Sequence, residues 1–169
     1  TLADRLEPLR QTHPADALLE MLQQARDSSG SRKPVLSVGR DGITLRHQIG
    51  FFEVATAATL SVYDRAGKRL RTVYLAHPPE PGQATMDQML TQLLTALFER
   101  LDGALPRLAY VTDSGSNEVT YFQRVLRKMK HPVSGAKLHW TRITDFYHVS
   151  ERVWAMANAL FTKPQQQQA

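Results

Sequence analysis

The segments Val35-Leu-Ser-Val-Gly-Arg-Asp41-Gly42 and Leu108-Ala-Tyr-Val-Thr-Asp113-Ser-Gly115 share one pattern. In each of them an apolar run typical of a β-strand stops at an aspartate that a turn-forming residue follows. Side chains at the carboxyl edge of a sheet face the crevice in which open α/β folds bind ligands. Two carboxylates on neighbouring strands at that edge are suited to holding divalent metal ions for phosphoryl transfer. The pattern therefore predicts an α/β fold with a candidate metal site at Asp41 and Asp113.

From residue 34 onward the periodicity predicts the element order β-β-β-α-β-α-β-α. The predicted strands are 34–39, 54–63, a third from Leu70, then 107–112 and 137–143; the predicted helices are 86–101, one from Ser116 that buries residues up to Met129, and 147–161. This order is similar to that of the ribonuclease-H-like fold, a mixed five-stranded sheet with flanking helices. Strands one and four lie side by side in that fold, so we expect Asp41 and Asp113 to meet in space.

Length and composition restrict the classes of protein to consider. A chain of 169 residues with 42% hydrophobic residues favours one folded domain. The absence of cysteine excludes disulfides, thiolate zinc sites and a cysteine nucleophile, and it fits the reducing cytoplasm, where we expect the protein to be associated with the nucleoid. No apolar run approaches the ~20 residues of a membrane span, so no membrane partner is expected.

The chain is basic, with 21 Lys and Arg against 16 Asp and Glu and a pI near 9.7. This balance fits a nucleic-acid partner, although an ordinary basic protein has the same composition. Some of the basic residues gather at the end of the helix that begins at Ser116. Among them Arg124, Arg127 and Lys128 are candidate contacts to DNA phosphates, and a solvated surface is the alternative interpretation.

Three regions are expected along the chain. Residues 1–33 form a helical lead-in with a short apolar stripe, which ends in the Ser/Gly-rich linker Asp27-Ser-Ser-Gly-Ser31. Residues 34–162 form the core. Residues 163–169 are rich in glutamine and are expected to be a disordered tail.

A third acidic segment is Arg142-Ile-Thr-Asp145-Phe-Tyr-His148-Val-Ser-Glu151-Arg152. Asp145 ends a predicted strand, and His148 and Glu151 share a face if the following residues are helical. Together with Ser37-Val-Gly-Arg-Asp41-Gly42 and Tyr110-Val-Thr-Asp113-Ser-Gly115, this segment resembles the DDE transposases of bacterial insertion sequences, in the branch with an Asp/Cys-x-x-His signature. The resemblance covers about residues 35–161.

The resemblance implies a ribonuclease-H-like core in which three acids bind two Mg²⁺ (or Mn²⁺) ions for DNA strand cleavage and strand transfer. Asp41 and Asp113 match the first two acids, and Asp145 and His148 match the signature that acts near flanking DNA. The third acid is either Glu151, as in members without an insertion, or a glutamate beyond an insertion domain. The chain ends where that insertion should begin, which favours the second alternative. The implied partners are transposon ends and target DNA, with a possible homo-oligomer.

These residues support three functional hypotheses. The first is the N-terminal part of a transposase catalytic core, weak or inactive by itself. The second is a complete small nuclease of the same fold that uses Glu151. The third is a non-enzymatic DNA-binding or oligomerisation module. Each residue also has a purely structural interpretation, because Asp41-Gly42 is typical of a turn, Asp113 of a helix cap, and His148 and Glu151 of a solvated helix face.

Overall fold

The computed structural model describes residues 13–48, 51–113 and 115–161. Its centre is a five-stranded sheet in the order β3-β2-β1-β4-β5. The strands are β1 (Val35–Gln48), β2 (Phe51–Tyr63), β3 (Arg69–His77), β4 (Arg107–Thr112) and β5 (Trp140–Thr144). The first three strands pair antiparallel, whereas β4 pairs parallel with both β1 and β5. This order and these directions confirm the predicted α/β sheet of the ribonuclease-H-like type, including the adjacency of strands one and four.

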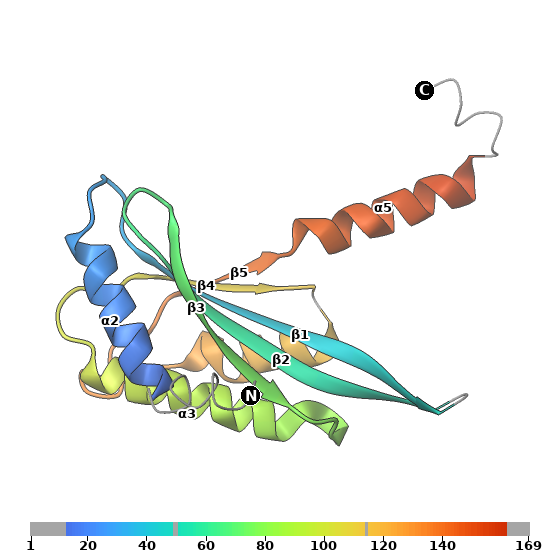
Figure 1. The fold of residues 1–169 in the computed structure, drawn as a ribbon, viewed down its shortest axis with the longest axis horizontal. Helices are drawn as coiled ribbons and strands as arrows, with labels where there is room; N and C mark the ends of the chain where they lie inside the picture. Colours follow the sequence, from blue (N-terminus) through green and yellow to red (C-terminus); the bar gives the residue numbers. More distant parts are fainter. Residues whose placement is uncertain (1–12, 49–50, 114, 162–169) are drawn as a thin grey trace, which may run out of the picture.

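One layer of helices covers one face of this sheet (Figure 1). The layer contains α2 (Pro14–Asp27), α3 (Ala84–Arg100) and α4 (Ser116–Arg124), with the short 3-10 helices η1 (Pro81–Gln83) before α3 and η2 (Leu126–Lys128) after α4. Leu36, Val38, Leu60 and Tyr110 meet fully buried residues of the helices in a single core. The last helix, α5 (Phe146–Leu160), extends away from the sheet.

The N-terminal region packs into the main core. α2 buries Ala15, Leu18, Met21, Leu22 and Ala25, each at most 1% exposed, and these residues belong to the same cluster as the strands. Their spacing at three and four residues places them on one helix face, which explains why the helix docks on the sheet layer. The residues before and after the boundary predicted at residue 33 therefore share one hydrophobic core. The predicted tail 163–169 lies outside the described residues.

β1 is longer than the sequence predicts. The expected stop at Asp41-Gly42 is wrong, because β1 pairs with β2 without interruption from Val35 to Arg46. Beyond Gly39 the strand loses its partner β4 but keeps β2, so it continues as one arm of a hairpin. Two other limits also differ: the second core helix ends at Arg124 and not near Met129, and β5 begins at Trp140 and not at residue 137.

Within the described part of the chain, no helix is both long enough and apolar enough to cross a lipid bilayer.

Candidate active site

Three aspartates lie just beyond the ends of the parallel ladders that join the neighbouring strands β1, β4 and β5. The parallel ladder of β1 and β4 ends at the pair Gly39 and Val111, and Asp41 and Asp113 each follow two residues later. The ladder of β4 and β5 ends at Thr112 and Thr144, so Asp113 and Asp145 are the next residues on each side. All three aspartates line one open hollow of about 440 Å³. The pairing register therefore brings together three acids that are far apart in the sequence.

The floor of this hollow is the face of the sheet that α2, α3 and α4 leave uncovered. It is made by alternate residues of β1 and β2, which point away from the buried Leu36 and Val38. These floor residues are small or polar: Ser37, Gly39, Ala57, Thr59 and Ser61. A Cβ atom at Gly39 would lie 2.6 Å from Thr59 Oγ1, so a larger residue there would crowd the floor. The hollow is a shallow polar surface suited to an extended polar ligand.

The three aspartates differ in their hydrogen bonds. Asp41 is exposed, and within the described ranges no hydrogen bond or ion pair holds its carboxylate. Asp113 Oδ1 accepts a hydrogen bond of 2.8 Å from the backbone N–H of Gly115. Asp145 Oδ1 accepts one of 2.9 Å from the backbone N–H of Tyr147, which caps the N-terminus of α5. Asp41 is therefore free to take a ligand, whereas Asp145 also stabilises a helix end.

Glu118 is a fourth acid at this edge, which no sequence pattern predicted. It lies in the first turn of α4 and is only 5% exposed. A Cβ atom at Gly115 would overlap its Oε2 and would lie 3.2 Å from Asp113 Oδ1, so the two carboxylates approach the same point. Burial raises the pKa of Glu118, and the negative charges of Asp113 and Asp41 raise it further, against the opposing effects of a backbone hydrogen bond and Arg40.

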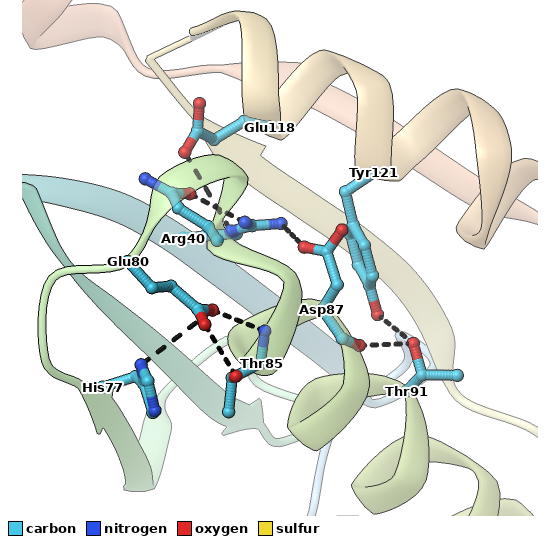
Figure 2. Close-up of polar contacts among 9 residues, drawn as sticks. Arg40, His77, Glu80, Thr85, Asp87, Thr91, Glu118 and Tyr121 are labelled. Atoms are coloured by element: carbon cyan, nitrogen blue, oxygen red, sulfur yellow. Dashed lines mark hydrogen bonds and ion pairs between the residues drawn. The ribbon is translucent and has the colours of Figure 1, made fainter.

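A buried arginine lies behind the acids, on the helix side of the sheet. The side chain of Arg40 is 0% exposed, and its guanidinium donates to Asp87 Oδ1 at 2.5 Å and to Gln83 Oε1 at 2.7 Å. Its Nε is 4.0 Å from Glu118 Oε1, and its Cζ lies 5.2 Å from the centre of the Tyr121 ring. Figure 2 shows the guanidinium between Asp87 of α3 and Glu118 of α4. Arg40 thus connects both helices to the strand that carries Asp41.

The start of α3 is itself held to β3, which fixes the partners of Arg40. Glu80 Oε1 accepts from the backbone N–H of Thr85 at 2.5 Å, and Glu80 Oε2 accepts from the Thr85 hydroxyl at 2.7 Å. His77 Nδ1 at the end of β3 is 3.9 Å from the same carboxylate (Figure 2). Hydrogen bonds from Thr85 lower the pKa of Glu80. The carboxylate therefore remains ionised and caps the helix.

The carboxylates of this site are of the right chemical type for a divalent metal ion, but they are not grouped closely enough to hold one. Carboxylate oxygens are the hard ligands that Mg²⁺ and Mn²⁺ prefer, and within the described ranges none of Asp41, Asp113 and Asp145 is in an ion pair. In the part of the chain that the structure describes, no three His, Cys, Asp or Glu side chains are grouped closely enough to hold a metal ion. Asp41 and Asp113 would hold the ion, and a third ligand would have to move toward them.

Several predicted site residues lie elsewhere. Glu151 is exposed on the second turn of α5 and does not line the hollow. His148 lies in α5, but its side chain is outside the described part of the structure. Arg124, Arg127 and Lys128 are exposed at the end of α4 and in η2, and Arg127 lines a different hollow. The structure brings together Asp41, Asp113 and Asp145, and it separates them from these basic residues.

Comparisons with known proteins add little to this geometry. No family pattern matches the chain, and no curated protein matches it. The crystal structure of A. aeolicus Argonaute is similar over 68% of this chain and 15% of its own, with a TM-score of 0.38 and 13% identity. The crystal structure of NurA with manganese is similar over 79% of this chain and 29% of its own, with a TM-score of 0.22 and 17% identity. The fold assignment therefore rests on strand order and direction.

Proposed function

We propose that this chain is part of the catalytic core of a DDE-type transposase, which cleaves and transfers DNA strands with Mg²⁺ or Mn²⁺. The observation that carries the proposal is the row of Asp41, Asp113 and Asp145 at the edge of β1, β4 and β5. Metal-dependent phosphoryl transfer requires carboxylates that can meet around the metal ions, and these three lie on neighbouring strands. The resemblance of the three sequence segments to DDE transposases supplies the choice of DNA as substrate.

In this proposal each group of the site has a separate task. Bound metal ions supply activation of the attacking oxygen and stabilisation of the leaving oxygen. Asp41 and Asp113 would hold those ions, and the open polar floor admits an extended phosphodiester. Arg40 positions the edge by fixing β1 against α3 and α4. Asp145 and His148 would act near the flanking DNA.

Apart from the glutamate beyond an insertion domain that the resemblance implies, the third carboxylate has two candidates within this chain. Glu151 matches the position of the third acid in members without an insertion, and it would reach the hollow only if α5 turned toward the sheet. Glu118 is already at the edge beside Asp113. Its raised pKa makes it a poorer ligand until a cation neutralises its neighbours. The variants Glu151→Gln and Glu118→Gln therefore distinguish the two.

The test is nicking of supercoiled plasmid with Mg²⁺ or Mn²⁺, together with calorimetry of Mn²⁺ binding. Nicking by this part of a core is expected to be weak, and we expect Asp41→Asn and Asp113→Asn each to reduce it to background and to weaken Mn²⁺ binding. Asp102→Asn, which changes an exposed aspartate outside the hollow, is the matched control. Undiminished nicking in both site variants would refute the metal mechanism.

A non-enzymatic DNA-binding or oligomerisation module is the second candidate. The absence of a preassembled group of three metal ligands in the described residues favours it. The exposed apolar side chains of α5, such as Trp154 at 70% and Leu160 at 68%, also favour it. This function predicts no nicking with either metal, together with DNA binding that survives the change of both aspartates to asparagine. A complete small nuclease, in contrast, loses nicking in Glu151→Gln.

A further inference from the structure

The positive charge of this chain is concentrated in one segment. Between Glu118 and Asp145 the sequence has no acidic residue. The same segment carries six Lys and Arg residues: Arg124, Arg127, Lys128, Lys130, Lys137 and Arg142. Because the net charge of the whole chain is only +5, this segment alone accounts for the excess. Such segregation is the electrostatic pattern of a surface for polyanions.

These residues lie at the end of α4, in η2, in the turn before β5 and, for Arg142, in β5 itself. All six are exposed. Within the described ranges none of them is in an ion pair, whereas some basic residues elsewhere are paired, as Arg71 is with Glu20 and Arg100 with Asp16. We call these six residues the basic surface. Its charges are not neutralised by the protein itself.

Two of the charges are held opposite each other by the backbone. Lys130 and Lys137 form an isolated antiparallel bridge, and His131 closes the turn with a backbone hydrogen bond of 2.7 Å to Ala136. The imidazole of His131 also accepts from the N–H groups of Val133 and Ser134. Like charges directly opposite in an antiparallel pair are destabilising. The hydrogen bonds of the turn therefore hold two lysines where both could contact one anion.

A hollow of about 430 Å³ adjoins this turn. It is lined by Phe122, Arg127, Lys137, Leu138, His139, Trp140 and Thr141. The lining therefore contains both basic and aromatic side chains, which is the combination that contacts the phosphates and bases of nucleic acid. The indole N–H of Trp140 is buried without a hydrogen-bond partner, so this wall also has an unsatisfied donor.

We infer that the basic surface binds the sugar–phosphate backbone of DNA at a distance from the acids. The inference rests on the proposed function for the identity of the nucleic acid. Trp140 pairs with Leu108, five residues before Asp113 on β4, so it lies about 17 Å from Asp113 along the strand direction, on the helix side of the sheet. That distance equals about five base-pair steps of duplex DNA. The basic surface thus anchors DNA that flanks the bond at the acid edge.

The experiment is fluorescence anisotropy of a labelled 20-base-pair duplex with the full chain, in EDTA and over a range of NaCl concentrations. The test variant is Lys128→Gln/Lys130→Gln/Lys137→Gln. The control variant, Lys33→Gln/Arg46→Gln/Lys68→Gln, removes the same number of exposed charges outside the basic surface. We expect the test variant to bind about 100-fold more weakly at 0.1 M salt, with a salt slope smaller by roughly 3.

Three outcomes decide the inference. A loss confined to the test variant supports it, and a parallel titration with single-stranded DNA, whose slope per contact is smaller, shows which form is held. Equal affinities of the test and control variants would overturn it, as would no binding by wild type at 50 mM salt.

A separate result distinguishes this inference from the catalytic proposal. Binding in EDTA by Asp41→Asn/Asp113→Asn, with nicking absent in wild type, would reject the catalytic proposal and leave this inference standing.

Discussion

Removal of the Arg40 side chain should destabilise the protein strongly, because it leaves buried partners unpaired. In Arg40→Met the Asp87 and Gln83 side chains lose hydrogen bonds of 2.5 and 2.7 Å, and Glu118 loses its cation. Removal of one partner from a buried pair costs about 3–5 kcal/mol. Since the Asp87 side chain is 36% exposed and regains water, we expect the lower end, about 3 kcal/mol.

The assay is urea unfolding followed by circular dichroism at neutral pH. A loss of about 3 kcal/mol corresponds to a fall in Tm of about 9 °C for a chain of this length. Arg40→Lys retains the charge without the planar fork of donors, so its loss should be intermediate. Arg46→Met on the exposed arm of the same strand is the control and should stay within about 0.5 kcal/mol of wild type.

A double-mutant cycle identifies which partner matters. If the cost comes from an uncompensated Glu118, then Glu118→Gln should restore part of the stability lost in Arg40→Met. A stability of Arg40→Met within about 0.5 kcal/mol of wild type would refute the reasoning, since the loss of a buried ionic contact must exceed that of a surface change. If Glu118→Gln restores no stability to Arg40→Met, then the loss comes from the contact of Arg40 with Asp87 and not from that with Glu118.

Three further results are expected. Gly30→Ala should lower the free energy of unfolding by about 1–3 kcal/mol, because φ there is +133° and a Cβ atom would overlap a backbone carbonyl of the β2–β3 turn; a stability equal to wild type in urea would contradict this. Asp113→Asn should lower the pKa of Glu118 in a ¹³C NMR titration. Because the pKa of Glu118 is raised on folding, the stability that its protonated form contributes is lost as the pH rises above 4.5 through the pKa of the folded protein. This loss should be smaller in the variant. An unchanged pKa of Glu118 would show that the two carboxylates do not interact. Burial raises the pKa of Tyr121 to about 12, so the stability that its protonated hydroxyl contributes should be lost as the pH rises from 10 through 12. Absorbance at 295 nm should show that Tyr121→Phe removes a tyrosine that ionises near pH 12 and not one that ionises near pH 10.

The order of the sheet could be predicted from sequence because its determinants are local. Alternating apolar residues indicate strands, the three- and four-residue period indicates helices, and the order of elements restricts the topology. The length of β1 could not be predicted in this way. Asp41-Gly42 has the residues of a turn, but the pairing with β2 is a non-local interaction that overrides this preference.

The site was predicted in part for the same reason. Asp41 and Asp113 end apolar runs, and their approach follows from the parallel register of β1 and β4. Arg40 was missed although a signal was present, since it continues the buried alternation of Leu36 and Val38 on the helix side. Glu118 was missed because an acid in the first turn of a helix is common for electrostatic reasons alone, so its burial is visible only in three dimensions.

The divergence of β1 from β4 after Gly39 has a mechanical consequence. Up to that residue, interstrand hydrogen bonds fix the spacing of the two backbones. Asp41 lies beyond this point, in the arm where β1 pairs only with β2. The exposed apolar residues of this arm include Ile43 and Phe52. No hydrogen bond between β1 and β4 therefore fixes the separation of Asp41 from Asp113, which follows from the course of the arm. A partner that bound the exposed apolar residues of the arm and changed its course would change the distance between the two carboxylates.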